Sequence, residues 1–185
     1  MKLNMPQKCV GEFPSELKEK FLSRIKPEHW LENTTRNKAR NLEQTQSIVI
    51  RHFLNLDYKY GRHAMYDDWQ EYIINFKLYD EYRDLIEESK EELRKYYNFK
   101  NYMCFLAKLI PHGRIGRHPD SGVFLETCHR VHIPLKTNPE VYYIIEGKPY
   151  YWQENNIYEF DNTREHEAMN ASSEERIHLI FNLYD

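Results

Sequence analysis

Beyond about residue 100, the sequence is a succession of short segments in which apolar and polar side chains tend to alternate. β-Branched and aromatic residues are frequent in these segments. Such segments are typical of β-strands. We expect six strands here, over residues 102–110, 130–136, 141–145, 149–153, 157–160 and 176–184. Clusters of Gly, Pro, Asn and Asp between them are typical of turns. Several short strands joined by turns predict a barrel of jelly-roll type, a cupin-like double-stranded β-helix.

The first hundred residues predict mostly helices instead. Ser15 is expected to be the N-cap of a helix whose apolar residues recur at helical spacing. The clearest helix extends from about residue 78 to residue 97 and has one apolar face and one face of Glu and Lys. A short alternating run at residues 47–51 predicts one strand. The apolar face of the clearest helix consists of Leu78, Tyr82, Leu85, Ile86, Leu93 and Tyr97.

Composition and charge exclude several classes of function. The formal net charge of -3 gives no overall positive field to attract nucleic acid. The short basic segment RNKAR (36–40) is expected to be a solvated helix face. No run approaches the roughly 18 apolar residues of a transmembrane helix, and the N-terminus lacks an apolar signal-peptide segment. Motifs for a serine nucleophile, a P-loop or a dinucleotide site are missing.

The cysteines indicate the compartment. Cys9, Cys104 and Cys128 show neither zinc-ligand spacing nor a disulfide framework. A reducing cytoplasm is therefore the expected location. No feature of the sequence indicates an oligomeric state.

A possible metal site begins with His118 and Asp120. Residues two apart on an extended segment point to the same side, so one ion can take both side chains. A distal His166 would complete a set of two histidines and one carboxylate, which holds Fe(II) on one face and leaves positions open for oxygenase chemistry. A barrel can return His166 to the same cavity. The alternative is that the His-x-Asp triplet arises by chance in a Pro-Asp-Ser-Gly turn, in a chain with nine histidines.

Arg176 opens the last expected strand. On one interpretation it is a surface residue that pairs with Glu174 or Glu175. On the other, its guanidinium points into the barrel and forks onto a carboxylate of a dicarboxylic co-substrate. A buried Arg is costly without an anion, and such a co-substrate supplies one. The metal set and this Arg together predict a 2-oxoglutarate-dependent oxygenase.

Arg130 and His132 alternate with the apolar residues of their strand. The commoner arrangement turns such a polar face to water. If the face lines the cavity instead, both side chains are candidates for the carboxylates of 2-oxoglutarate. His178 shares a face with Arg176 and is interpreted as an interior or rim histidine. The other histidines have no partner at ligand spacing and are taken as non-functional: His29, His52, His63, His112 and His129.

These expectations define an α+β fold of one domain, residues 1–185. Residues 1–100 are expected to be a mainly helical support region. Residues 101–185 are expected to be the jelly-roll core that carries the metal and co-substrate site.

Three stretches of the C-terminal 80 or so residues resemble the aspartyl/asparaginyl β-hydroxylase family of Fe(II)/2-oxoglutarate oxygenases: GRIGRHPDSG (113–122), HRVHIPLKTNPEV (129–141) and EFDNTREHEAMNASSEERIHLIF (159–181). The resemblance implies that His118 and His166 bind iron. Asp120 matches the carboxylate of the bacterial free-proline hydroxylases, where the animal protein hydroxylases have Gly. The chain therefore resembles the bacterial and phage branch.

The same resemblance assigns the co-substrate contacts. Arg176 matches the residue that binds the distal carboxylate of 2-oxoglutarate, and Arg130 and His132 match further contacts. Fe(II), 2-oxoglutarate and O₂ are the implied cofactors, and no catalytic residue beyond the metal ligands is expected.

The implied reaction is hydroxylation of an amino-acid side chain in a protein or peptide. One alternative is a hydroxylase of a free amino acid such as proline. Another, from a different class, is a non-catalytic jelly-roll binding module that uses its tyrosines as a contact surface. The intact metal set argues against that module.

Overall fold

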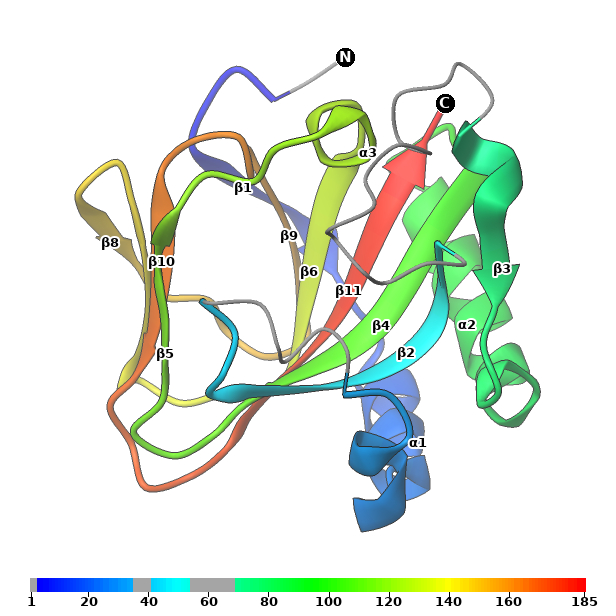
Figure 1. Cartoon of the computed structure of the whole chain (residues 1–185), viewed down its shortest axis with the longest axis horizontal. Helices are drawn as coiled ribbons and strands as arrows, with labels where there is room; N and C mark the ends of the chain where they lie inside the picture. Colours follow the sequence, from blue (N-terminus) through cyan, green and yellow to red (C-terminus); the bar gives the residue numbers. More distant parts are fainter. Residues whose placement is uncertain (1–2, 35–40, 54–68) are drawn as a thin grey trace.

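The computed structural model describes residues 3–34, 41–53 and 69–185, which form two antiparallel sheets that face each other (Figure 1). The larger sheet has seven strands in the order β1-β9-β6-β11-β4-β2-β3, and the smaller has four in the order β5-β10-β7-β8. This arrangement confirms the predicted jelly-roll barrel. The strands are β1 (Gln7–Glu12), β2 (Thr45–Phe53), β3 (Ile73–Asn75), β4 (Asn101–Leu109), β5 (Arg114–His118), β6 (His129–Lys136), β7 (Val141–Ile145), β8 (Lys148–Tyr150), β9 (Asn156–Phe160), β10 (His166–Asn170) and β11 (Arg176–Tyr184).

Two helices cover the outer face of the larger sheet, on the side away from the smaller sheet (Figure 1). They are α1 (Ser15–Arg24) and α2 (Tyr79–Arg94). The other helical segments within the described residues are α3 (Val123–Glu126), η1 (Pro27–Leu31) and η5 (Trp69–Tyr72). On α2, Tyr82, Leu85, Ile86 and Leu93 are fully buried, as the apolar pattern predicts. They join one core cluster with the outward-facing side chains of the sheet. Burial of each such side chain contributes about 1.5–3 kcal/mol, which holds the helices against the sheet.

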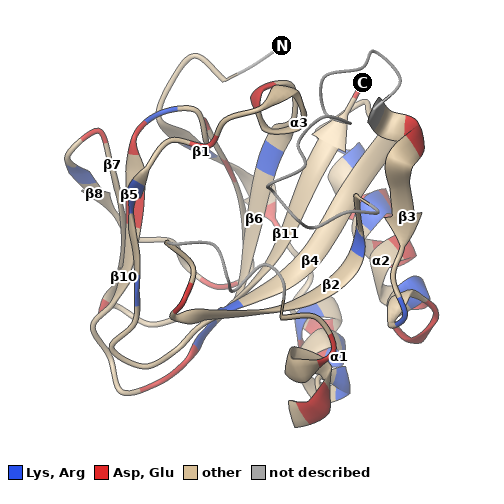
Figure 2. Cartoon of the chain, viewed as in Figure 1, with Lys and Arg blue, Asp and Glu red and all other residues tan. Residues whose placement is uncertain are grey.

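The charged residues are unevenly distributed between the helices and the sheet. Charged residues gather on α1, α2 and the loops, whereas the strands of the larger sheet are mostly uncharged (Figure 2). No helix in the described residues combines the length and the apolar composition needed to cross a membrane.

The expected N-cap at Ser15 is wrong. Helix α1 begins at Ser15, and its N-cap is Pro14. The Pro14 carbonyl accepts the hydrogen bond of the Lys18 backbone N–H at 3.1 Å, which makes Pro14 the residue that precedes the first helical position. No side-chain capping bond is formed, so the Ser15 hydroxyl does not perform the predicted role.

The first hundred residues contribute more than helical support. β1 pairs with β9, β2 pairs with β4, and β3 pairs with β2, all within the larger sheet. β2 contains the expected strand at residues 47–51 and extends it at both ends. The sequence reasoning missed β1 and β3, as well as β5 and β10 in the second half.

Candidate metal centre

Pairing between β5 and β10 brings two of the expected ligands together. His118 is the last residue of β5 and His166 the first residue of β10, and the two are Cα partners in the antiparallel register. Their ring centroids are 4.5 Å apart. Asp120 follows two residues after His118, where the backbone leaves the strand. The sheet therefore joins residues that are distant in the sequence.

One ligand atom from each of His118, Asp120 and His166 lies within 4.8 Å of the others. His118 Nε2 lies 3.7 Å from Asp120 Oδ1. No second group of this kind occurs in the part of the chain that the structure describes. His118 and Asp120 keep 22% and 15% of their side-chain surfaces exposed, so this end of the site reaches solvent.

Backbone carbonyls orient both imidazole rings. His118 Nδ1 lies 2.6 Å from the Gly116 carbonyl oxygen, and His166 Nδ1 lies 2.8 Å from the Arg164 carbonyl oxygen. A carbonyl can only accept, so each Nδ1 must carry the hydrogen and donate it. When such a ring is neutral, its bare nitrogen is then Nε2, which is the form that a metal ligand requires.

The ionisation states of the ligands suit a cation. Burial by itself raises the pKa of Asp120, but the Arg130 guanidinium, His166 and the Asn162 hydrogen bond together hold that pKa below its usual range. Burial lowers the pKa of His166, and this effect outweighs the opposing influence of the Asp120 carboxylate. Near neutral pH, Asp120 is ionised and His166 is neutral, so neither must change its protonation to bind a metal.

Asn162 holds the Asp120 carboxylate in place. Its amide nitrogen donates to Asp120 Oδ2 at 3.1 Å and to the Leu125 carbonyl oxygen at 3.0 Å. The Asp120 backbone N–H donates in return to the Asn162 carbonyl oxygen at 2.9 Å. Asn162 is only 1% exposed. Sequence reasoning took this residue as part of a turn, and no signal in the sequence distinguishes it from other turn asparagines.

Replacement of Asn162 with alanine is expected to weaken metal affinity about 10- to 100-fold, the usual effect of losing the group that orients a metal ligand. Calorimetric titration with Mn(II), a redox-stable substitute, measures the change. Asn98→Ala is the matched control, because Asn98 is exposed and does not line the site. Equal metal affinity in the Asn162→Ala and Asn98→Ala proteins would contradict the role of Asn162.

A cavity of about 270 Å³ extends from the metal ligands to Arg176 on β11. Arg176 is 1% exposed, and its Nη1 donates to the Tyr143 hydroxyl at 2.9 Å. Its Nε is buried without a partner, and none of the ion pairs among the described residues includes Arg176. An anionic ligand in the cavity would offset the cost of burying this guanidinium.

The surface interpretation of Arg176 does not hold in this structure. Glu174 and Glu175 pair with lysines instead: Lys136 Nζ lies 3.7 Å from Glu174 Oε2, and Lys108 Nζ lies 3.5 Å from Glu175 Oε2. Arg176 belongs to the inner face of its strand, and the two acids lie before the strand begins.

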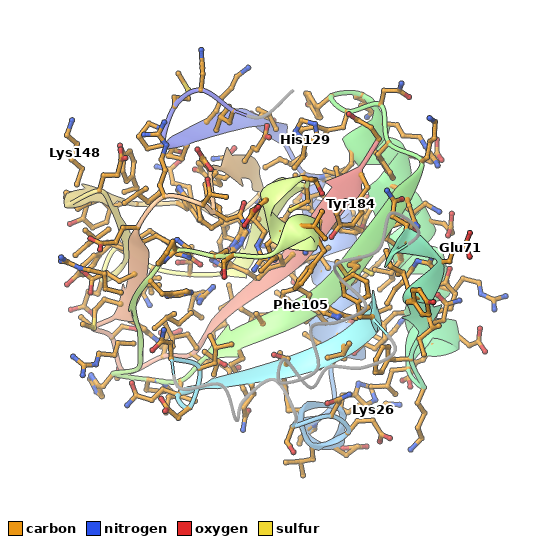
Figure 3. The ribbon with its side chains drawn as sticks, turned by 45° about the horizontal axis from the view of Figure 1, so that its top comes forward. Lys26, Glu71, Phe105, His129, Lys148 and Tyr184 are labelled. Atoms are coloured by element: carbon orange, nitrogen blue, oxygen red, sulfur yellow. The ribbon has the colours of Figure 1, made fainter. Side chains whose placement is uncertain are left out.

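The polar face of β6 also lines the cavity. Arg130 is 8% exposed, and its Nη1 donates to Asn182 Oδ1 at 2.7 Å. Its guanidinium carbon lies 5.5 Å from the centre of the Phe105 ring, near the middle of the molecule (Figure 3). His132 is 3% exposed, and burial followed by the Arg130 charge places its pKa well below the usual value. The opposite face of β6 packs in the core cluster with the helices, so neither face meets water.

Of the other histidines in the described residues, one lines the cavity. His52, on β2, lines the cavity although sequence reasoning took it as non-functional. His29 is hydrogen-bonded to Tyr82, and His129 is hydrogen-bonded to Glu159. His112 is exposed, so none of these three belongs to the site. His63 and the RNKAR segment lie outside the described residues. Sequence reasoning also missed Phe105, Tyr143 and Asn182 as cavity residues, although strand alternation could have placed them on the inner face.

Comparisons with known proteins agree with this fold. The family model described as Aspartyl/Asparaginyl beta-hydroxylase matches residues 31–185. The structure is similar to a Pseudomonas putida prolyl-4-hydroxylase, with 12% identity and a TM-score of 0.57 over 98% of this chain and 93% of that chain. It is also similar to a viral collagen prolyl hydroxylase from Paramecium Bursaria Chlorella virus-1 in its 2OG complex, with 9% identity and a TM-score of 0.52 over 98% of each chain. At these identities the likeness shows the fold alone. No curated protein matches the sequence.

Proposed function

Because the chain belongs to the aspartyl/asparaginyl β-hydroxylase family of Fe(II)- and 2-oxoglutarate-dependent enzymes, we propose that it hydroxylates an amino-acid side chain within a protein or peptide. The observation that carries the proposal is the cavity itself. It holds a set of two histidines and one carboxylate at its open end. At the other end lies the buried Arg176, which has no ion-pair partner among the described residues.

The residues present fit the family's metal. His118, Asp120 and His166 would hold Fe(II) through two Nε2 atoms and one carboxylate oxygen, which is the facial set typical of iron oxygenases. Bound Fe(II) would supply the activation of O₂ that couples oxidation of 2-oxoglutarate to succinate and CO₂ with hydroxylation of the substrate. The protein's own part is to orient the ligands, through the Gly116 and Arg164 carbonyls and the Asn162 amide.

Two buried guanidinium groups fit the dicarboxylate. Arg176 would fork onto the distal carboxylate, and Tyr143 orients it by accepting one of its hydrogens. Arg130 and His132 lie on the same cavity wall and would donate to a carboxylate nearer the metal. Both Nε of Arg130 and Nε2 of His132 are buried without a partner among the described residues, so an oxygen-rich ligand would satisfy them.

The cavity favours a peptide substrate over a free amino acid. A free amino acid brings an ammonium group, which needs an acidic partner when it is taken out of water. Among the described residues that line the cavity, Asp120 is the only carboxylate, and it is a proposed metal ligand. In a peptide, the backbone nitrogen is uncharged, and only the reacting side chain must reach the exposed, metal end of the cavity.

A reducing compartment such as the cytoplasm fits the proposal. Cys9, Cys104 and Cys128 are all free thiols, and Fe(II) persists where oxidants are scarce.

The test is succinate release from 2-oxoglutarate in the presence of Fe(II) and O₂, screened first over free amino acids and then over peptides from a host-cell lysate. We expect stimulation by a peptide fraction, with a product heavier by one oxygen atom in the mass spectrum. Stimulation by a free amino acid such as proline, and by no peptide, would contradict the proposed substrate class. If the purified protein bound neither Fe(II) nor 2-oxoglutarate, the proposal that it is a 2-oxoglutarate-dependent hydroxylase would be contradicted.

A further inference from the structure

A pair of buried histidines lies at the cavity wall, and one of them has no role in the proposed site. His132 on β6 and His178 on β11 are 3% and 1% exposed, and their Nδ1 atoms are 3.3 Å apart. His132 lines the cavity, whereas His178 does not. His178 can therefore act on a bound ligand only through a neighbour, and its hydrogen-bonded neighbour is His132.

The Nδ1–Nδ1 contact restricts the hydrogens of both rings. Burial lowers the pKa of each histidine well below its usual value. The Arg130 and Arg176 charges add to this effect at His132, and the Arg176 charge adds to it at His178, so both rings are neutral. A neutral imidazole has one N–H and one bare nitrogen. For the two Nδ1 atoms to form a hydrogen bond, one must carry the hydrogen and the other must be bare.

The surroundings of His132 favour a bare Nδ1 on that ring. The Tyr143 hydroxyl accepts a hydrogen from Arg176 Nη1 at 2.9 Å, so its own hydrogen is directed elsewhere. His132 Nδ1 lies 3.5 Å from the same hydroxyl oxygen. A bare Nδ1 on His132 is thus within reach of two donors, Tyr143 and His178. With a hydrogen on that nitrogen, the Tyr143 hydroxyl would face a second donor.

We propose that His178 is a positioning residue: its Nδ1–H donates to His132 Nδ1 and thereby fixes the hydrogen of His132 on Nε2. His132 Nε2 is buried and has no partner among the described residues. With a hydrogen there, the ring presents a neutral donor to the cavity beside two guanidinium groups, which suits a carboxylate and repels a cation. The inference rests on the proposed function, because the carboxylate is that of 2-oxoglutarate.

The tautomers can be measured directly in the wild-type protein. Long-range ¹⁵N–¹H correlation spectra of labelled protein distinguish Nδ1–H from Nε2–H imidazoles, and single substitutions assign the signals. We expect Nε2–H on His132 and Nδ1–H on His178 at neutral pH without any ligand. An Nδ1–H on His132 would overturn the inference, whether or not the protein binds 2-oxoglutarate.

Two variants at His178 test the consequence for binding. His178→Leu keeps a similar volume without a donor, and His178→Asn places an amide nitrogen near the position of Nδ1. In an anaerobic titration, His178→Leu should bind 2-oxoglutarate about 3- to 10-fold more weakly than the wild type, which is the effect of losing one neutral hydrogen bond. In His178→Asn the affinity should be largely restored. Metal affinity measured without 2-oxoglutarate should be unchanged in both.

The outcomes separate the two hypotheses. A His178→Leu protein with wild-type 2-oxoglutarate affinity overturns the role of His178 alone. A wild-type protein that does not bind 2-oxoglutarate overturns the proposed function and this inference together.

Discussion

Replacement of His166 with alanine is expected to abolish turnover and to weaken metal affinity by more than about 100-fold. The reason is that loss of an outer group that only orients a ligand already costs about 10- to 100-fold, and His166 is proposed to bind the metal itself. Its ring is oriented by a hydrogen bond to the Arg164 carbonyl and packs edge-on against Phe160. Anaerobic equilibrium dialysis with Fe(II) measures the affinity, and succinate release measures turnover.

The matched control is His112→Asn. His112 is exposed in a turn with a φ of 56°, a backbone conformation that Asn adopts readily. This control also removes one imidazole but leaves the cavity untouched, so its metal affinity should equal that of the wild type. Wild-type metal affinity in His166→Ala would show that His166 is not a ligand.

Replacement of Arg176 with alanine should raise the 2-oxoglutarate requirement about 10- to 100-fold and leave metal affinity nearly unchanged. Charge-assisted hydrogen bonds contribute about 1.5–3 kcal/mol, and each 1.4 kcal/mol corresponds to roughly tenfold in affinity. Arg176 is 1% exposed, so its proposed contact with the distal carboxylate is made away from bulk water. The dissociation constant of 2-oxoglutarate at saturating Fe(II), without O₂, gives the effect.

Two further variants define what Arg176 contributes. Arg176→Lys keeps the charge but loses the planar fork, so its affinity should lie between those of the wild type and Arg176→Ala. Arg114→Ala removes an exposed Arg that does not line the cavity and should behave as wild type. Unchanged 2-oxoglutarate affinity in Arg176→Ala would show that the co-substrate is anchored elsewhere.

Much of the barrel could be predicted because its strands have strong local patterns. Residues 141–145 and 176–184 match β7 and β11 at both ends. β5 (RIGRH) and β10 (HEAMN) were missed because they have a Gly, charged residues and few β-branched side chains. Pairing with neighbouring strands makes them strands, and the sequence does not display that pairing. Because β1, β2 and β3 hydrogen-bond into the same sheet, we propose that residues 1–185 form one domain.

The candidate site was predicted to the extent that its chemistry depends on residue type. His118, Asp120 and His166 were selected by spacing and resemblance, and the structure brings them together. Asn162 and Tyr143 were not selected, because Asn in a turn and Tyr in a strand are ordinary residues whose roles depend on contacts far along the chain. The inner face of β6 was also ambiguous, since alternation alone does not say whether a polar face meets water or a cavity.

The most direct test of the central claim is an anaerobic titration of the wild-type protein with Fe(II) in the presence of 2-oxoglutarate, followed by visible absorption. The account places one Fe(II) on His118, Asp120 and His166, and 2-oxoglutarate between that ion and Arg176. A weak charge-transfer band should therefore grow during the titration and stop growing at one equivalent of iron. Folded protein that develops no such band at saturating Fe(II) and 2-oxoglutarate would contradict the account.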